Sequence, residues 1–205
     1  MRPGLANEIA EHTLEHLRLV MSSVSSATAA GVALGICATR GARLRRYSLA
    51  FANIVQTVPS LALFGFLIPL PFLGGVGERT AIVALVLYAL LPILRNTLTG
   101  ILGVDPVIRD SAVAMGLTGR QRLWYVELPL AARTIFAGLR VAVVATIGTA
   151  TIAAAIGAGG LGVFIFRGVA SVDTVQLLAG AVPAALIALA ADGGLGWIER
   201  KLSPV

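Results

Sequence analysis

Two histidines and a glutamate near the start of the chain have the spacing of a zinc site. His12, Glu15 and His16 match H-x-x-E-H, in which two imidazoles on one helix face can bind zinc. The only plausible third ligand outside this helix is Glu78. Because the helix that carries the histidines runs straight into an apolar stretch, we interpret the three residues as a polar collar rather than a metal site.

A second motif match is glycine-rich. Gly157, Gly159 and Gly162 have the spacing G-x-G-x-x-G of dinucleotide-binding loops, with a further glycine at Gly160. That motif binds a dinucleotide only between the strand and the helix of a βαβ unit, and no strand pattern precedes it here. We therefore predict close backbone packing at these glycines, with a bend or hinge as their function.

The chain has a single lysine, Lys201, which is followed by Leu202. A nucleotide-binding P-loop needs a lysine followed by Ser or Thr, so the chain has no such loop. If ATP drives this protein, a separate polypeptide must bind it together with Mg²⁺. We expect no cofactor, no metal site and no enzyme activity on this chain itself.

The elements that would position these residues are membrane helices. Apolar residues make up 57% of the chain and charged residues 13%, and the mean hydropathy is +0.89, outside the range of soluble domains. A helix needs about 20 mostly apolar residues to cross a bilayer. We predict one all-α membrane domain over residues 1–205, with spans near 17–39, 48–70, 80–101, 130–156 and 174–192. A sixth segment would arise if the run around Pro59, Pro69 and Pro71 breaks into a span and a re-entrant piece.

The net charge is +6, and the distribution of the basic residues indicates how the chain is oriented in the membrane. Twelve of the sixteen basic residues fall on one side of the predicted spans: Arg40, Arg43, Arg45, Arg46, Arg95, Arg109, Arg120, Arg122, Arg133, Arg140, Arg200 and Lys201. The other side has only Arg2, Arg18, Arg79 and Arg167. Because basic residues favour the cytoplasmic side, we expect the C-terminus in the cytoplasm and the N-terminus outside. Arginines that flank spans are not evidence for nucleic-acid binding.

A polar island between the third and fourth spans carries its own folding signals. Asp105 before Pro106 predicts a helix start, because the carboxylate caps free N–H groups and proline is tolerated at the first position. Gly116 predicts a left-handed helix end. Thr118 with Gln121 predicts a capping box for a second short helix. Two short helices that meet at a glycine bend would form a compact knob suited to a groove on a partner.

Ile108, Ala112 and Met115 are spaced to form one apolar face on the first of these helices. Pro129 is expected to end the second helix and to open the next one. The alternative is an ordinary amphipathic surface loop.

The spacing in this island resembles the cytoplasmic loop of ABC importer permeases, which reads E-A-A, three residues, Gly, nine residues, then I-x-L-P. Here Asp replaces Glu, Ser replaces the first Ala and Val126 replaces Ile, while the spacing is kept. In that family the loop docks the membrane subunit onto a separate ATPase. The resemblance implies a coupling loop at about 105–128, with these residues involved: Asp110, Ser111, Ala112, Met115, Gly116, Leu128 and Pro129.

Polar residues at membrane depth must find partners or face a water-filled path. Two groups are our candidates for a translocation path: Asn53, Gln56, Thr57 and Ser60 around Pro59, and Thr146, Thr149 and Thr151 in the fourth span. Tyr88, in the third span, is a further candidate because it is the one Trp or Tyr away from the predicted cytoplasmic ends. The alternative for such small polar residues is packing between helices.

Three stretches are similar to the glycine betaine, carnitine and choline branch of the permease family: 13–17, 53–62 and 147–162. This resemblance implies a type I importer in the bacterial plasma membrane. Its partners would be an ATPase, an external solute-binding protein, membrane lipid, and a second permease copy or a homologous permease. Another small solute, such as an amino acid, remains an alternative substrate. A passive channel or membrane scaffold without an ATPase is the alternative from a different class.

Overall fold

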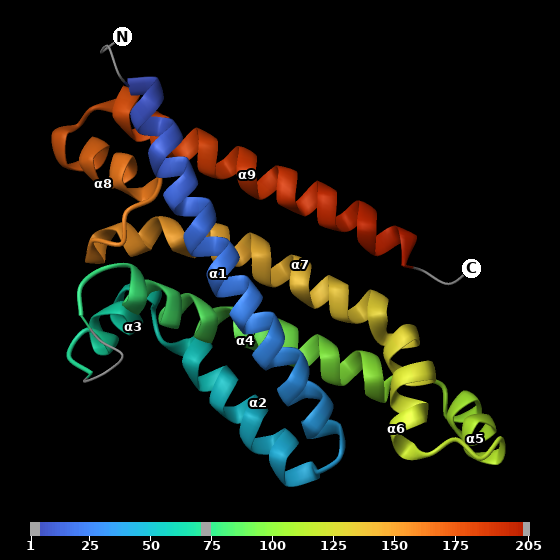
Figure 1. The fold of residues 1–205 in the computed structure, drawn as a ribbon. Coiled ribbons are helices and arrows are strands. Elements are labelled where there is room, and N and C mark those ends of the chain that lie inside the picture. The colour runs from blue at the N-terminus through green and yellow to red at the C-terminus, as the bar shows by residue number, and fades with distance from the viewer. Residues whose placement is uncertain (1–4, 71–74, 203–205) are drawn as a thin grey trace.

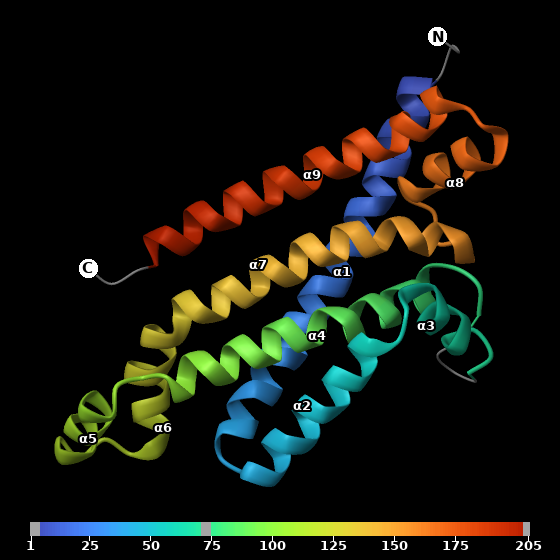
Figure 2. The same cartoon turned by 180° about the vertical axis from the view of Figure 1, so that it is seen from behind.

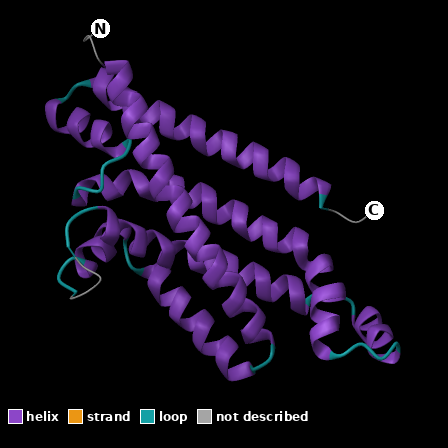
Figure 3. Ribbon diagram, in the orientation of Figure 1, coloured by secondary structure: helices purple, strands orange, loops and turns teal. Residues whose placement is uncertain are grey.

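The computed structural model describes residues 5–70 and 75–202, and the part of the chain described is helical, with no strand (Figure 3). Arg2 and Pro71 lie outside these ranges. Four long helices are apolar enough to cross a membrane: α1 (Leu5–Thr39), α4 (Glu78–Leu102), the run Gly119–Ile156 that contains α7 (Leu128–Ile152), and α9 (Thr174–Lys201). α1 begins twelve residues before the predicted span, and α9 continues nine residues beyond it.

α4 occupies the centre of the helix bundle. It packs against α1, α2 and α7, and α9 lies along the other side of α7 (Figures 1 and 2). Small residues permit the close approach of α1 and α4. A Cβ added at Gly31 would lie 2.8 Å from Ile93 Cγ2, and one at Gly35 would lie 2.6 Å from Thr97 Cγ2.

The second predicted span, near 48–70, is broken, which is the alternative that the prolines of this run left open. α2 (Ala42–Thr57) and α3 (Ser60–Leu67) meet at 104°. Proline disfavours helical backbone in the residue before it, and Val58 is extended, with φ −73° and ψ 127°. The break at Pro59 makes the pair either a bent span or a span with a re-entrant piece.

A short helix that the sequence analysis did not predict follows the glycine-rich stretch. α8 (Gly162–Ser171) packs against α9 and ends at Val172, which adopts the left-handed conformation with φ 52°. Its ten residues are too few to cross a bilayer, so the lengths of the apolar stretches do not predict it.

Candidate functional site

The knob, defined as residues 105–128, folds as its capping signals predict. Asp105 accepts a hydrogen bond from the Val107 amide at 2.8 Å and begins α5 (Pro106–Ala114). Gly116 has φ 79°, and Leu117 N donates to Ala112 O at 3.1 Å, which closes the helix end. Both the start and the left-handed end are therefore confirmed.

The second half of the knob differs from expectation at its end. The capping box forms: Gln121 N donates to Thr118 Oγ1 at 3.4 Å, and Thr118 N donates to Gln121 Oε1 at 2.9 Å. However, Pro129 does not end the helical run that begins with α6 (Gly119–Arg122). It passes through a π-helical turn, η1 (Leu123–Glu127), directly into α7. Leu128 N donates to Leu123 O, five residues back, and this wider turn accommodates a proline that cannot donate.

The residues that the resemblance implies for docking differ in how far they are exposed to solvent. Asp110, Ser111, Gly116 and Pro129 are exposed, Leu128 is half-buried, and Ala112 is buried. The predicted apolar face is not packed inward, because Ile108 is 42% exposed and Met115 73% exposed. Together with exposed Val113, these two side chains give α5 an unpartnered apolar surface at the tip of the protein (Figure 1).

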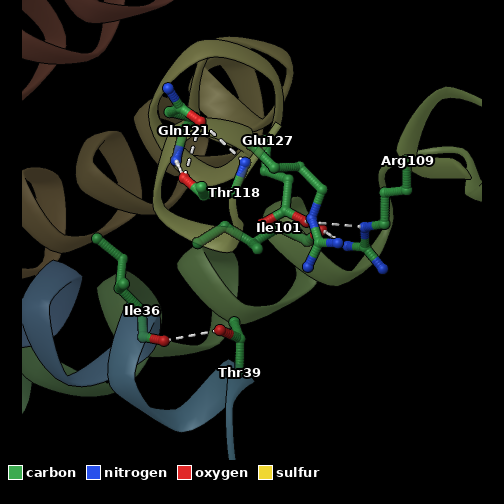
Figure 4. A network of polar contacts seen from close by, with 8 residues as sticks. Ile36, Thr39, Ile101, Arg109, Thr118, Gln121 and Glu127 are labelled. Atoms are coloured by element: carbon green, nitrogen blue, oxygen red, sulfur yellow. Dashed lines mark hydrogen bonds and ion pairs between the residues drawn. The ribbon is translucent and has the colours of Figure 1, made fainter. Parts of the chain in front are cut away.

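Glu127 is a polar residue of the knob that sequence reasoning missed. It is buried, and its carboxylate accepts a hydrogen bond from Arg122 Nε at 3.1 Å (Figure 4). Arg109 Nε also lies 3.1 Å from Glu127 Oε1, close enough for an ion pair although not directed as a hydrogen bond. Arg109 in turn donates to the carbonyl of Ile101, near the end of α4. Glu127 was missed because it occupies the x position of the I-x-L-P pattern, where the motif specifies no residue type.

A cleft of about 490 Å³ opens beside this network. It is lined by Thr39, Arg40, Ile101, Leu102, Arg109, Gly119, Arg120, Arg122, Leu123 and Glu127. Four arginines against one glutamate make the cleft strongly basic.

The first group of candidate path residues, taken together with Tyr88, lies on α2, α3 and α4. Asn53 Oδ1 accepts from Arg95 at 2.9 Å, and Gln56 Nε2 donates to Tyr88 O at 3.3 Å. The Tyr88 hydroxyl donates to Val58 O, at the break between α2 and α3. Thr57 instead bonds to Ile54 O in its own helix, and Ser60 is half-buried. Three of the five residues therefore connect α2 to α4.

The second group is separate from the first. Thr146, Thr149 and Thr151 each donate to a carbonyl of their own helix, Ala142, Ala145 and Gly148 respectively, at 2.7 to 2.9 Å. Thr146 is buried, whereas the other two are half-buried. Asn53 and Gln56 of the first group thus bond across to α4, whereas the hydrogen bonds of the second group stay within α7, and a path along either group stays a prediction.

The four glycines predicted to bend the chain form a tight turn after η2 (Ala153–Ile156). Gly157, Gly159 and Gly160 all have left-handed φ, between 75° and 78°. Gly160 N donates to Glu15 Oε2 at 2.9 Å, which attaches the turn to α1. Gly162 packs so closely that an added Cβ would lie 1.8 Å from Thr151 O. The bend is confirmed, and a hinge movement there stays a prediction.

The residues of the zinc pattern have other partners. His12 Nδ1 lies 2.7 Å from Glu15 Oε2, and its ring meets Phe164 edge-on at 5.1 Å. His16 is buried, and Glu78 pairs with Arg18 at 3.4 Å. Across residues 5–70 and 75–202, no group of three His, Cys, Asp or Glu side chains is placed to hold a metal ion.

Residues 28–204 match the family described as Binding-protein-dependent transport system inner membrane component. The chain belongs to this family. Its members are multi-pass inner-membrane components of transport systems, which move solutes and are not enzymes.

Two relatives of the permease cover nearly all of it. The glycine betaine/carnitine/choline transport system permease protein OpuCD of Bacillus subtilis (strain 168) is 45% identical over 191 residues, 93% of this chain and 82% of that protein. The osmoprotectant import permease protein OsmW of Salmonella typhimurium is 42% identical over 201 residues, 97% of this chain and 94% of that protein.

Solved transporters share the fold of the permease. The membrane chain of the MetNI methionine ABC transporter, in an inward-facing form, superposes with a TM-score of 0.89 at 22% identity, covering 100% of both chains. An amino acid ABC transporter with histidines gives 0.80 at 17% identity, covering 96% of this chain and 94% of that one. The fold predicted from the loop motif and the spans, that of a type I ABC importer permease, is thereby confirmed.

Proposed function

We propose that this permease is the translocation subunit of an ATP-driven importer and that its knob docks onto a separate ATPase. The observation that carries the proposal is the exposed apolar surface of α5, held at the tip of the protein by the bend at Gly116. Exposed apolar side chains that no element of the chain covers are typical of protein interaction sites.

The ATPase would bind ATP and Mg²⁺, and its closure would push the knob. Alternating access would follow as a rigid-body movement of the helices. An external solute-binding protein would deliver the solute, and a second permease, identical or homologous, would complete the pathway. The knob and the C-terminus would face the cytoplasm and the N-terminus the outside, because the basic residues concentrate at the knob end.

The solute is best assigned to the quaternary amines, such as glycine betaine, carnitine or choline. Relatives that are 42 to 45% identical over more than nine-tenths of the chain are named for these compounds or for osmoprotectants. The two solved transporters reported above that are named for amino acids are 22% and 17% identical, so they support an amino-acid substrate less well.

Recognition of the solute would rest mainly with the solute-binding protein. Quaternary ammonium groups are usually held by several aromatic faces. Tyr47, Trp124, Tyr125 and Trp197 are exposed near the expected cytoplasmic end, and the hydroxyl of Tyr88 is bonded to Val58. The described Trp and Tyr residues thus offer no aromatic cage, and a weak transit site fits them better.

The docking role is tested by purifying the tagged permease in mild detergent, with Gly116→Val as the variant. At φ 79° a β-branched residue is strained by about 1–2 kcal/mol, and open space surrounds the added Cβ, so only the bend is affected. We expect an ATPase to co-purify with the unaltered chain and to be lost from the variant. Gly41→Ala is the control, because Gly41 has φ −152° and equal space.

If the ATPase stays bound to Gly116→Val, the docking role of this bend is rejected. If no ATPase co-purifies with the folded, unaltered chain, the docking role is rejected and a channel or scaffold is favoured. The solute is tested separately by uptake of labelled glycine betaine in competition with choline, carnitine and amino acids. Competition by amino acids alone would overturn the quaternary-amine assignment.

A further inference from the structure

A single buried carboxylate connects the knob to two of the membrane helices. Glu127 closes the π-helical turn at the start of α7 and is 7% exposed. It meets Arg109 of α5 and Arg122 of α6, each at 3.1 Å. Through Arg109, which bonds to the carbonyl of Ile101, the same contact reaches α4 (Figure 4).

α5 has little else to attach it to the bundle. Its main packing partners are α6 and η1, and Ala112 is its one buried residue. Besides the covalent linker 103–105 from α4, the Arg109 side chain therefore links α5 both to α4 and to Glu127 at the start of α7. A force applied to the exposed face of α5 can pass through the linker 103–105, through the bend at Gly116 or through this guanidinium, and the guanidinium contacts both α4 and Glu127.

The position of Glu127 also suits a role in transmitting movement from the knob to α7. A π-helical turn inside a long helix is uncommon and often lies at a functional site. Here it separates α6 from α7, so Arg122 and Glu127 join the two sides of the turn. The adjacent cleft leaves space for the arginines to take a second arrangement. Coupling between distant sites is carried by side-chain networks that have two such arrangements.

We propose that Glu127, with Arg109 and Arg122, is the joint that transmits movement of the knob to α4 and α7. The inference rests on the proposed function. Glu127 is a positioning residue in this role, because it lies behind the docking surface and acts through the two arginines.

The test uses the complete importer, with its ATPase and solute-binding protein, reconstituted in liposomes. Solute transported and ATP hydrolysed are measured together for Glu127→Gln, Arg109→Gln and Arg122→Gln. We expect the ATPase to remain bound and to hydrolyse ATP, while the solute moved per ATP falls about fivefold or more, as for loss of a coupling between sites. The double variant Arg122→Gln/Glu127→Gln should be no worse than Glu127→Gln, because residues that act as one unit are not additive.

Arg200→Gln is the control, an exposed arginine at the far end of α9 that should keep the normal ratio. If Glu127→Gln does not insert, Arg122→Gln, at a side chain 33% exposed, tests the same joint. An unchanged ratio with the ATPase bound would overturn the joint alone. Loss of the ATPase from these variants would reassign the network to docking, whereas absence of an ATPase from the unaltered chain would refute the proposed function instead.

Discussion

Arg140 of α7 and Asp192 of α9 form a two-pronged ion pair, with nitrogen–oxygen distances of 2.6 and 2.7 Å. Glu199, two turns further along α9, lies 3.4 Å from the same guanidinium. Both carboxylates therefore hold α9 against α7 through one arginine. A guanidinium that meets a carboxylate with two parallel bonds is held more firmly than one with a single long contact.

Asp192→Asn should accordingly lower the Tm of the purified permease by more than Glu199→Gln does. Asparagine keeps the shape but loses the charge and one of the two acceptors, whereas Glu199 loses only a long contact. The Tm of each variant is measured in detergent by heating the protein and monitoring the loss of the folded peak by size-exclusion chromatography. A Tm for Asp192→Asn equal to that of the unaltered permease would show that the pair does not hold α9, and equal falls for the two variants would contradict the greater strength of the Asp192 contact.

Gly162→Ala should prevent normal packing of α8. The added Cβ would lie 1.8 Å from Thr151 O, so the backbone must shift, and overpacking of this kind costs about 1–3 kcal/mol or more. Gly148→Ala is the matched control in α7, because nothing lies within 4 Å of its added Cβ. The recovery of monodisperse protein should fall for the first variant and not for the second. Normal recovery of Gly162→Ala would contradict the close approach.

Tyr88→Phe should destabilise the break at Pro59. It removes the donor to Val58 O, and because Val58 is half-buried the lost hydrogen bond should cost about 1 kcal/mol. We expect a lower Tm and reduced uptake. Tyr47→Phe, at a side chain 70% exposed, should change neither. If both variants behave alike, the hydroxyl of Tyr88 does not support the bend.

Thr146→Val should leave uptake unchanged. The threonine hydroxyl is buried and bonds only to Ala142 O of its own helix, so valine keeps the shape at a cost of about 1 kcal/mol or less. The measurement is the initial rate of uptake at saturating solute. A marked fall in that rate with normal insertion would contradict this expectation and support Thr146 as a residue of the translocation path.

The knob shows how far local signals reach. Asp105, Gly116, Thr118 and Gln121 act on backbone groups within three residues of themselves, and each takes the predicted role. The π-helical turn before Pro129 escaped prediction, because a proline can end a helix or be absorbed by a wider turn. Leu123 of the wider turn is buried against Ile101 of α4 and Ala131 of α7, a contact between distant segments that favours this turn.

The polar path residues were chosen by type alone. Type did not show that Asn53, Gln56 and Tyr88 bond to other segments, whereas the four threonines bond within their own helices.

The sequence by itself determined the membrane class, the four long spans, the glycine bends and the family, because hydropathy, capping and spacing are properties of neighbouring residues. Only the tertiary structure decided three further points: the 104° angle between α2 and α3, the packing of α8 on α9, and the burial of Glu127 between Arg109 and Arg122. These depend on contacts between segments far apart in the chain. A buried charge is stable only where the fold brings its partners to it.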